Sequence, residues 1–162
     1  MPTEIDPGER EAILSRARER AQAAGAAYNG NLTPLEAGQL VHAGVARVID
    51  VRSRFEWEFV GRVPDSALVE WRIYEPDGAD RLKARPNEQF VEQLRAIARP
   101  QETLLVLCRS GVRSQGAAAA AVAAGFANAF NILEGFEGDP DPHKHRGQIG
   151  GWRKHGLPWI QG

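Results

Sequence analysis

Thr103-Leu-Leu-Val-Leu-Cys-Arg-Ser-Gly-Val-Arg-Ser114 is the segment of this chain that is most informative about its fold. Its first five residues, 103–107, are a short and mostly aliphatic run, which is typical of a buried strand. An alanine-rich segment, residues 114–124, follows and stops at a glycine, as helices often do. The stretch therefore predicts a strand and a helix joined by the six-residue loop Cys108–Arg113.

Segments of the same two kinds occur on both sides of this stretch. Further strands are predicted at residues 47–51, 67–71 and 129–133, helices at 7–24, 33–44 and 87–99, a turn at 29–31, a connecting loop at 74–86 and a short terminal helix around Trp152. Strands that alternate with helices imply a parallel sheet covered by helices on both faces. The predicted fold class is therefore α/β.

Functional residues are expected at one edge of this sheet. The carboxyl ends of parallel strands emerge at the same edge, and sites form there. Four segments should converge at that edge, namely Asp50–Arg52, Trp71–Arg72, Cys108–Arg113 and the loop that begins at Glu134. The cysteine therefore lies on the side of the sheet where chemistry is expected.

The composition narrows the classes of function. The 162 residues include one cysteine, and 20 basic against 21 acidic side chains leave a net charge of −1. One cysteine cannot close an internal disulfide or supply a four-thiolate zinc site, and the balanced charge predicts neither nucleic-acid nor membrane binding. The polar amino terminus carries no secretion signal, and no run reaches the ~18 apolar residues of a membrane span. We therefore expect a cytoplasmic protein.

Cys108 lies in a setting that favours its reactive form. The loop precedes a helix amino terminus, where unpaired N–H groups and the helix dipole attract negative charge. Gly111 permits a backbone angle that lets successive amides surround one anion, and Arg109 and Arg113 add positive charge. These features favour the thiolate, which is the nucleophilic form. The alternative is a structural cysteine that ends a core strand, with both arginines in solvent.

Three motifs, in order along the chain, resemble those of the rhodanese (thiosulfate sulfurtransferase) family, and of its single-domain members in particular. The family's first motif is matched by residues 50–52, 56–57 and 61–64, its active-site loop by 107–114, and its carboxyl-terminal motif by 132–136, 151–152 and 156–158. The resemblance runs from about Leu32 to Trp159. It implies a three-layer fold with a central parallel sheet, divided into an amino-terminal helical extension, 1–31, and a rhodanese-like domain, 32–162.

The resemblance also implies sulfur transfer through a covalent intermediate. Cys108 would take the outer sulfur of thiosulfate or a similar anionic donor, and the persulfide would pass it to cyanide, a thiol or a protein acceptor. No metal or cofactor is implied. Arg109 and Arg113 are the expected anchors of the donor, because guanidinium groups suit oxyanions. The expected substrate-binding residues are Arg109, Ser110, Gly111, Val112 and Arg113, with Asp50, Arg52 and Ser114 as supports and Trp71 and Arg146 at the rim.

The sequence departs from the family pattern at two places. Arg62 stands where the family has histidine, so we transfer Asp50 and Arg52 only as structural supports. An insertion, residues 137–150, lengthens the link before the last motif and is a candidate wall of the active-site mouth. Its candidate metal ligands are Asp139, Asp141, His143 and His145. A solvated surface loop is the preferred interpretation of that segment.

Two rival functions stay open. Phosphatases and arsenate reductases of the dual-specificity cell-cycle type resemble the family in fold, but they need five residues between the cysteine and a coordinating arginine. Here Arg113 falls one position early and Ser114 takes that place. The second rival is a persulfide carrier or protein-binding module, for which the helix at 7–24 is a candidate element for partner docking or self-association. Packing of that helix onto its own domain is the preferred interpretation. The intact loop around Cys108 favours catalysis.

Overall fold

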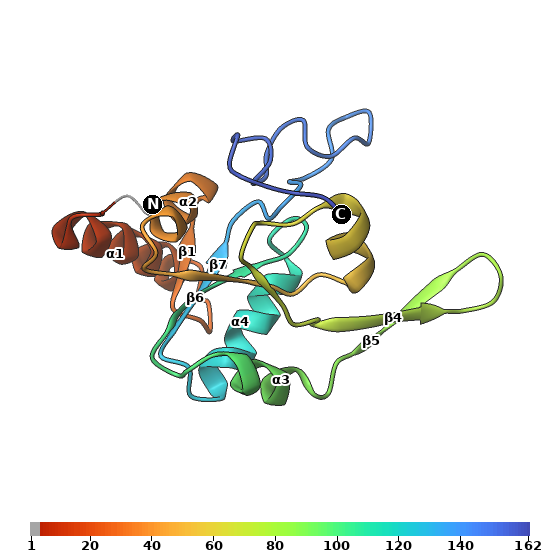
Figure 1. Ribbon diagram of the computed structural model, residues 1–162, viewed down its shortest axis with the longest axis horizontal. Coiled ribbons are helices and arrows are strands. Elements are labelled where there is room, and N and C mark those ends of the chain that lie inside the picture. Colours follow the sequence, from red (N-terminus) through yellow and green to blue (C-terminus); the bar gives the residue numbers. More distant parts are fainter. Residues whose placement is uncertain (1–3) are drawn as a thin grey trace.

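Five parallel strands form the central sheet of the computed structural model, which describes residues 4–162 (Figure 1). The strands are β1 (Gly30–Leu32), β2 (Arg47–Asp50), β3 (Ala67–Leu68), β6 (Thr103–Leu107) and β7 (Asn128–Ile132), in the spatial order β1-β7-β6-β2-β3. The aliphatic strand β6 lies in the middle of the sheet, between β7 and β2, as expected of a strand that is apolar on both faces. The predicted α/β class with a parallel sheet is confirmed.

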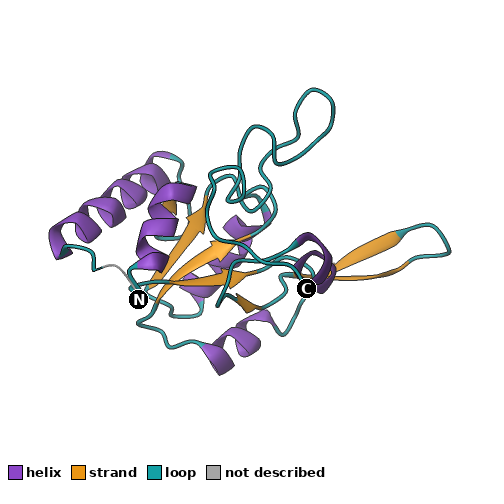
Figure 2. Ribbon diagram, turned by 45° about the horizontal axis from the view of Figure 1, so that its top comes forward, coloured by secondary structure: helices purple, strands orange, loops and turns teal. Residues whose placement is uncertain are grey.

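Helices cover both faces of this sheet (Figure 2). They are α1 (Pro7–Ala23), α2 (Pro34–His42), α3 (Phe90–Ile97) and α4 (Arg113–Ala123). Leu105 of β6 lies in the apolar core that includes α1 and α2, whereas the next residue, Val106, lies in the core that includes α3 and α4. The two layers therefore follow from the alternation of side chains along a strand. None of the helices in residues 4–162 is long and apolar enough to cross a membrane.

The amino-terminal helix α1 packs against the sheet and against α2. Ile13 and Ala17 are buried in the same core as strand β6. On the polar side, Arg20 Nη1 lies 2.7 Å and Arg16 Nε 3.2 Å from the carboxylate of Glu36 in α2. Burial of this carboxyl favours its neutral form, but the hydrogen bonds from Arg20, a backbone amide and Arg16 outweigh that effect and lower the pKa of Glu36 to about 2. The predicted extension thus contributes directly to the core.

The loop predicted at residues 74–86 is instead a β-hairpin. Strand β4 (Arg72–Pro76) pairs antiparallel with β5 (Leu82–Pro86), and the hairpin projects from the body of the protein at the right of Figures 1 and 2. All of β5 and both ends of β4 are exposed, so neither strand shows the alternation that marks a half-buried strand. The backbone ladder and the exposed ion pair Arg85–Glu75, 2.9 Å, hold the hairpin together.

Four smaller segments also differ from the prediction. Residues 30 and 31 of the predicted turn belong to β1, which pairs with β7, and the strand predicted at 67–71 is confined to β3. The chain around Trp152 forms turns rather than a helix. A π-helix, η1 (Glu56–Val60), occupies a segment for which no element was predicted. Such short elements depend on their neighbours in space, because they are too short to show a periodic pattern.

Candidate active site

Cys108 follows the last residue of the central strand β6 and opens the loop before α4. It is buried, with 1% of its surface exposed, and its Sγ accepts a hydrogen bond from the backbone N–H of Gly111 at 3.1 Å. The hydroxyl of Ser114 lies 3.2 Å from the same sulfur. The sulfur therefore lies between an amide and a hydroxyl, and both groups are able to donate to a thiolate.

Most of the other amides of the loop have no partner in the part of the chain that the structure describes. Across residues 4–162, no hydrogen bond is found for the backbone N–H groups of Arg109, Ser110, Val112 and Arg113. These amides lead into the amino terminus of α4, where the helix dipole also favours negative charge. The loop is thus equipped to hold an anionic atom attached to the cysteine.

The turn that follows β7 braces this loop from one side, as the predicted convergence of the two segments requires. The N–H of Phe136 donates to the carbonyl of Cys108 at 2.8 Å, and that of Glu137 donates to the carbonyl of Arg109 at 2.9 Å. Gly135 has a φ of +66°, and a Cβ there would lie 2.5 Å from the carbonyl oxygen of Cys108. Only glycine allows the turn to approach the loop this closely.

A buried chain of polar side chains leads away from the sulfur. Ser114 Oγ donates to Asn131 Oδ1, and Asn131 Nδ2 donates to Asn31 Oδ1 at 3.1 Å. The hydroxyl of Tyr28 donates to the same Asn31 oxygen at 2.9 Å. Sequence reasoning missed both asparagines. The available signal was Asn131 inside an otherwise apolar strand, because a buried amide needs hydrogen-bond partners.

Arg113 is paired with a carboxylate rather than left free in the cavity. Its Nη1 and Nη2 lie 2.9 Å from Oε1 and Oε2 of Glu56, in η1. Burial disfavours the charge on Glu56, but the hydrogen bonds and the charge of Arg113 outweigh this and hold the pKa of that carboxyl below its usual value. Burial acts likewise against the Arg113 charge, yet Glu56 raises the pKa of the guanidinium above its usual value. Both groups are therefore charged at neutral pH.

Asp50 and Arg52 form a second ion pair, which is completely buried. Arg52 Nη2 lies 2.6 Å from Asp50 Oδ2 and donates to the carbonyl of Gly61 at 2.7 Å. Burial raises the pKa of the Asp50 carboxyl, and the hydrogen bonds from Arg52 act against that rise. The guanidinium carbon of Arg52 lies 4.4 Å from the centre of the Phe136 ring. The pair thus connects the segment after β2 to the turn that braces the cysteine loop.

A cavity of about 670 Å³ lies beside the loop. The loop lines it with Arg109, Ser110 and Val112, and the hairpin lines it with Arg72 and Leu82. Neither Arg72 nor Arg109 has an ion-pair partner among residues 4–162. The predicted convergence of the segment after residue 71 with the cysteine loop is therefore present, and it brings two unpaired guanidinium groups to one cavity.

The two residues predicted at the rim do not line this cavity. Trp71 packs edge-on against Phe90 with ring centres 5.0 Å apart. Arg146 donates to the carbonyl of Gly138 at 2.7 Å within the insertion 137–150. That insertion projects at the top of Figure 1, whereas the hairpin projects to the right.

The insertion contains no cluster of metal ligands. In residues 4–162, no group of three or more histidine, cysteine, aspartate or glutamate side chains is placed to hold a metal ion. The backbone N–H groups of His143 and His145 both donate to the Asp141 carboxylate at 2.9 Å. That carboxylate shapes the loop.

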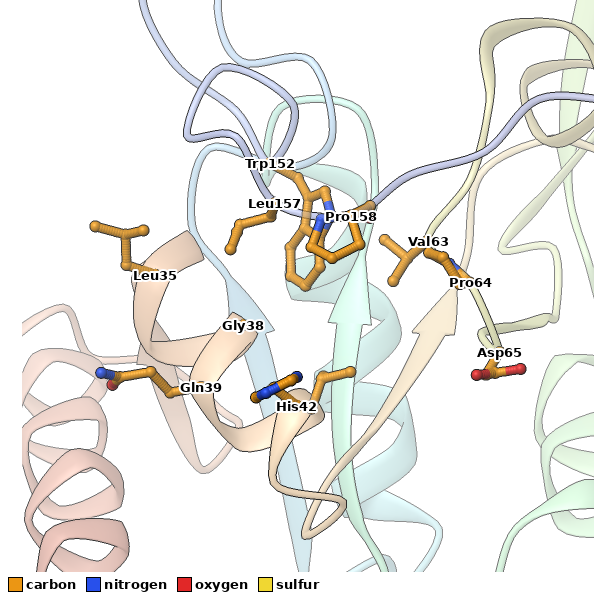
Figure 3. A pocket seen from close by; sticks show the side chains of 11 residues that line it. Leu35, Gly38, Gln39, His42, Val63, Pro64, Asp65, Trp152, Leu157 and Pro158 are labelled. Atoms are coloured by element: carbon orange, nitrogen blue, oxygen red, sulfur yellow. Dashed lines mark hydrogen bonds between the residues drawn. The ribbon is translucent and has the colours of Figure 1, made fainter. Parts of the chain in front are cut away.

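A second cavity, of about 700 Å³, lies away from the cysteine loop. Figure 3 shows Gln39 and His42 of α2 along one side, Pro64 and Asp65 along the other, and Trp152 at the end. None of its lining residues belongs to the segment 108–114. Chemistry at the cysteine is therefore associated with the first cavity.

Comparison with known proteins identifies relatives of this chain. Residues 33–139 match the family described as Rhodanese-like domain. An uncharacterized protein of Rickettsia conorii is 33% identical over 116 residues, which cover 70% of this chain and 82% of that protein. The crystal structure of Rv0390 from M. tuberculosis is 43% identical, with a TM-score of 0.69, and the match covers 83% of this chain and 99% of that one. The polysulfide-sulfur transferase homodimer of Wolinella succinogenes, 19% identical over 98% of this chain and 95% of its own, shares the fold with a TM-score of 0.53.

Proposed function

The chain belongs to the rhodanese-like domain family, and on that premise we propose that it is a sulfurtransferase that works through a persulfide on Cys108. The observation that carries this proposal is the 3.1 Å hydrogen bond from the Gly111 amide to the cysteine sulfur, inside a loop whose neighbouring amides find no partner among residues 4–162. We place the activity in residues 32–162. The donor is thiosulfate or a similar anion, and the acceptor is cyanide or a thiol.

The first half-reaction loads the cysteine. The Cys108 thiolate attacks the outer sulfur of thiosulfate, the S–S bond of the donor breaks, and sulfite leaves with the bonding electron pair. The product is the persulfide Cys108–S–S⁻, so charge and atoms balance. Its outer sulfur stands about 2.05 Å beyond Sγ, where the loop amides and the dipole of α4 stabilise its negative charge.

The second half-reaction removes the outer sulfur from the Cys108 persulfide. A thiophilic acceptor such as cyanide attacks the outer sulfur and leaves as thiocyanate, which restores the Cys108 thiolate. The chain has one cysteine, so no second thiol of its own resolves the persulfide. The two half-reactions therefore predict ping-pong kinetics.

The two arginines of the loop have different roles in this proposal. Arg109 lines the cavity and has no ion-pair partner in the described part of the chain, so we assign it to the anionic group of the donor. Arg113 is held by Glu56, so it positions the first turn of α4 and with it the loop. Ser114 donates its one proton to Asn131 in the structure and turns it toward the sulfur when the thiolate forms. Asp50 with Arg52 supports the loop through the Phe136 turn.

Mass spectrometry of the intact protein tests the loading step. After treatment with thiosulfate, we expect the mass of one sulfur atom to be added at Cys108, sulfite to be released in equal amount, and cyanide to remove the added mass. Cys108→Ser should gain no sulfur. Ser66→Ala, which removes a hydroxyl bound to the Val63 carbonyl, is the matched control and should load normally.

A parallel assay with phosphomonoesters and arsenate separates the rival enzyme. Robust phosphomonoester turnover or arsenate reduction without sulfur loading would reverse the assignment in favour of the phosphatase and arsenate reductase class. If thiosulfate loads Cys108 but the sulfur does not pass to cyanide or small thiols, the result would favour a persulfide carrier whose acceptor is another protein.

A further inference from the structure

Three large apolar side chains are exposed on the walls of the cavity beside the cysteine loop. Phe55, Leu82 and Val112 are 51%, 62% and 68% exposed. They come from three separate segments, namely the residues before η1, the hairpin and the cysteine loop. Exposed apolar side chains that gather around one cavity indicate a surface that a ligand covers.

The same cavity carries an excess of positive charge. Arg72 and Arg109 have no ion-pair partner among residues 4–162. Glu56 is the one acidic residue among those that line the cavity, and Arg113 matches its charge. An anionic group is therefore favoured between the hairpin and the loop.

An inorganic donor would use only part of this surface. Thiosulfate offers oxygens to the arginines but has no apolar surface to cover Phe55, Leu82 or Val112. A cavity of about 670 Å³ is also of the size that holds organic ligands rather than a small ion. Charged and apolar features on one cavity fit an anion that carries an organic group.

We propose that the preferred donor at this site is an organic sulfane-sulfur anion whose apolar group lies against Phe55, Leu82 and Val112 and whose charged head lies between Arg72 and Arg109. The proposal rests on sulfur transfer at Cys108 and names the substrate class for it. The hairpin, which supplies Arg72 and Leu82, is then the element that determines donor specificity.

The chemical step is the same attack on an outer sulfur. With a thiosulfonate, R–SO₂–S⁻, the Cys108 thiolate bonds to the terminal sulfur and the S–S bond of the donor breaks. The sulfinate R–SO₂⁻ leaves with the bonding pair, and Cys108–S–S⁻ remains. The reaction needs no oxidant, reductant or cofactor, because sulfur is transferred as a neutral atom.

Benzenethiosulfonate and methanethiosulfonate are the matched probes, because they differ only in the apolar group. We expect kcat/KM with the phenyl compound to exceed that with the methyl compound by about tenfold or more, with cyanide as acceptor. Part of any such ratio reflects intrinsic reactivity, so the change of the ratio in variants isolates the contact with the protein.

Two variants and two controls complete the kinetic test. Leu82→Ser should lower the phenyl-to-methyl ratio of kcat/KM about threefold or more, because it weakens the reaction of the phenyl compound more than that of the methyl compound. Arg72→Gln should lower kcat/KM about tenfold for both compounds through KM, with the ratio unchanged. The control Ile149→Ser removes an equally exposed apolar residue outside the cavity, and Arg81→Gln removes a charge elsewhere on the hairpin. Both controls should behave as wild type.

Binding to Cys108→Ser separates this inference from the reaction itself. Calorimetry should show that this variant binds benzenesulfinate more tightly than methanesulfinate, and that adding Leu82→Ser removes the difference. Equal binding of the two sulfinates, or a kinetic ratio that Leu82→Ser leaves unchanged, overturns the inference while sulfur loading from thiosulfate still upholds the enzyme. Selective sulfinate binding without sulfur loading by any donor would uphold the pocket and refute the sulfurtransferase.

Discussion

Arg113 and Glu56, which are 57 residues apart in sequence, are joined by two hydrogen-bonded contacts of 2.9 Å. The pair connects the first turn of α4 to η1 across the mouth of the cysteine loop. Its side chains are 17% and 19% exposed, so the attraction is only partly screened by water. A guanidinium that the sequence marks as an anion anchor is thus committed to a carboxylate of its own chain.

Breaking this pair should destabilise the protein and disturb the loop. We expect Arg113→Ala to lower the free energy of unfolding by about 2 kcal/mol, because it leaves Glu56 charged and partly buried without its partner. Urea denaturation measures this change. The exposed pair Arg85–Glu75 is the control, and its coupling in a double-mutant cycle should stay below about 0.5 kcal/mol. Equal coupling in the two pairs would contradict the structural role of Arg113.

Stability should fall in acid because of Glu36. Its pKa of about 2 in the folded protein lies below the ordinary value of 4.5, so its stabilisation is complete above about pH 5 and is lost as the pH falls toward 2. Glu36→Gln should lower the free energy of unfolding by roughly 3 kcal/mol at pH 7. It should also flatten the decline of that free energy between pH 5 and 2. Urea denaturation at a series of pH values checks both. A parallel decline in wild type and variant would show that other carboxyls dominate.

Gly135 should tolerate no side chain. Gly135→Ala places a methyl group 2.5 Å from the backbone of Cys108 and Arg109, which cannot yield as a side-chain end can. We expect the free energy of unfolding to fall by about 3 kcal/mol or more and sulfur loading of Cys108 to become slower. Gly156→Ala is the matched control, because its φ of +74° resembles the +66° of Gly135 but nothing lies within 4 Å. Gly156→Ala should lower the free energy of unfolding by only about 1 kcal/mol. Similar decreases in the two variants would exclude the steric explanation.

The hydroxyl of Ser114 should matter for loading as well as for folding. Ser114→Ala removes its contact with the Cys108 sulfur and leaves the buried Asn131 oxygen without that donor. We expect about 1–3 kcal/mol of lost stability. The persulfide-loading rate should be about five- to tenfold lower, because no hydroxyl is left that turns its proton from Asn131 to the thiolate as it forms. Stopped-flow detection of sulfite release measures the rate. An unchanged rate in a destabilised variant would limit Ser114 to a structural role.

The residues alone were enough to predict the central strand, the loop, the following helix and the parallel α/β sheet. These features depend on local patterns, since residues 104–107 of β6 are a continuous aliphatic run and residues 117–121 of α4 are all alanine, the strongest helix former. They also place Cys108 at the carboxyl edge of the sheet, because parallel strands end together. The hairpin β4–β5 escaped prediction because its exposed strands carry no apolar face.

Which side chains face one another at that edge depends on contacts between distant segments, and these form only in the folded molecule. The fold pairs Arg113 with Glu56, places Arg72 beside the cysteine loop, and brings together Asn131 and Asn31, which are 100 residues apart. The physical reason is that hydrogen bonds and ion pairs act over a few ångströms in space, whereas sequence patterns report only the neighbours along the chain. Local patterns along the chain thus locate the nucleophile, and long-range contacts in the fold select the charges and apolar side chains that surround it.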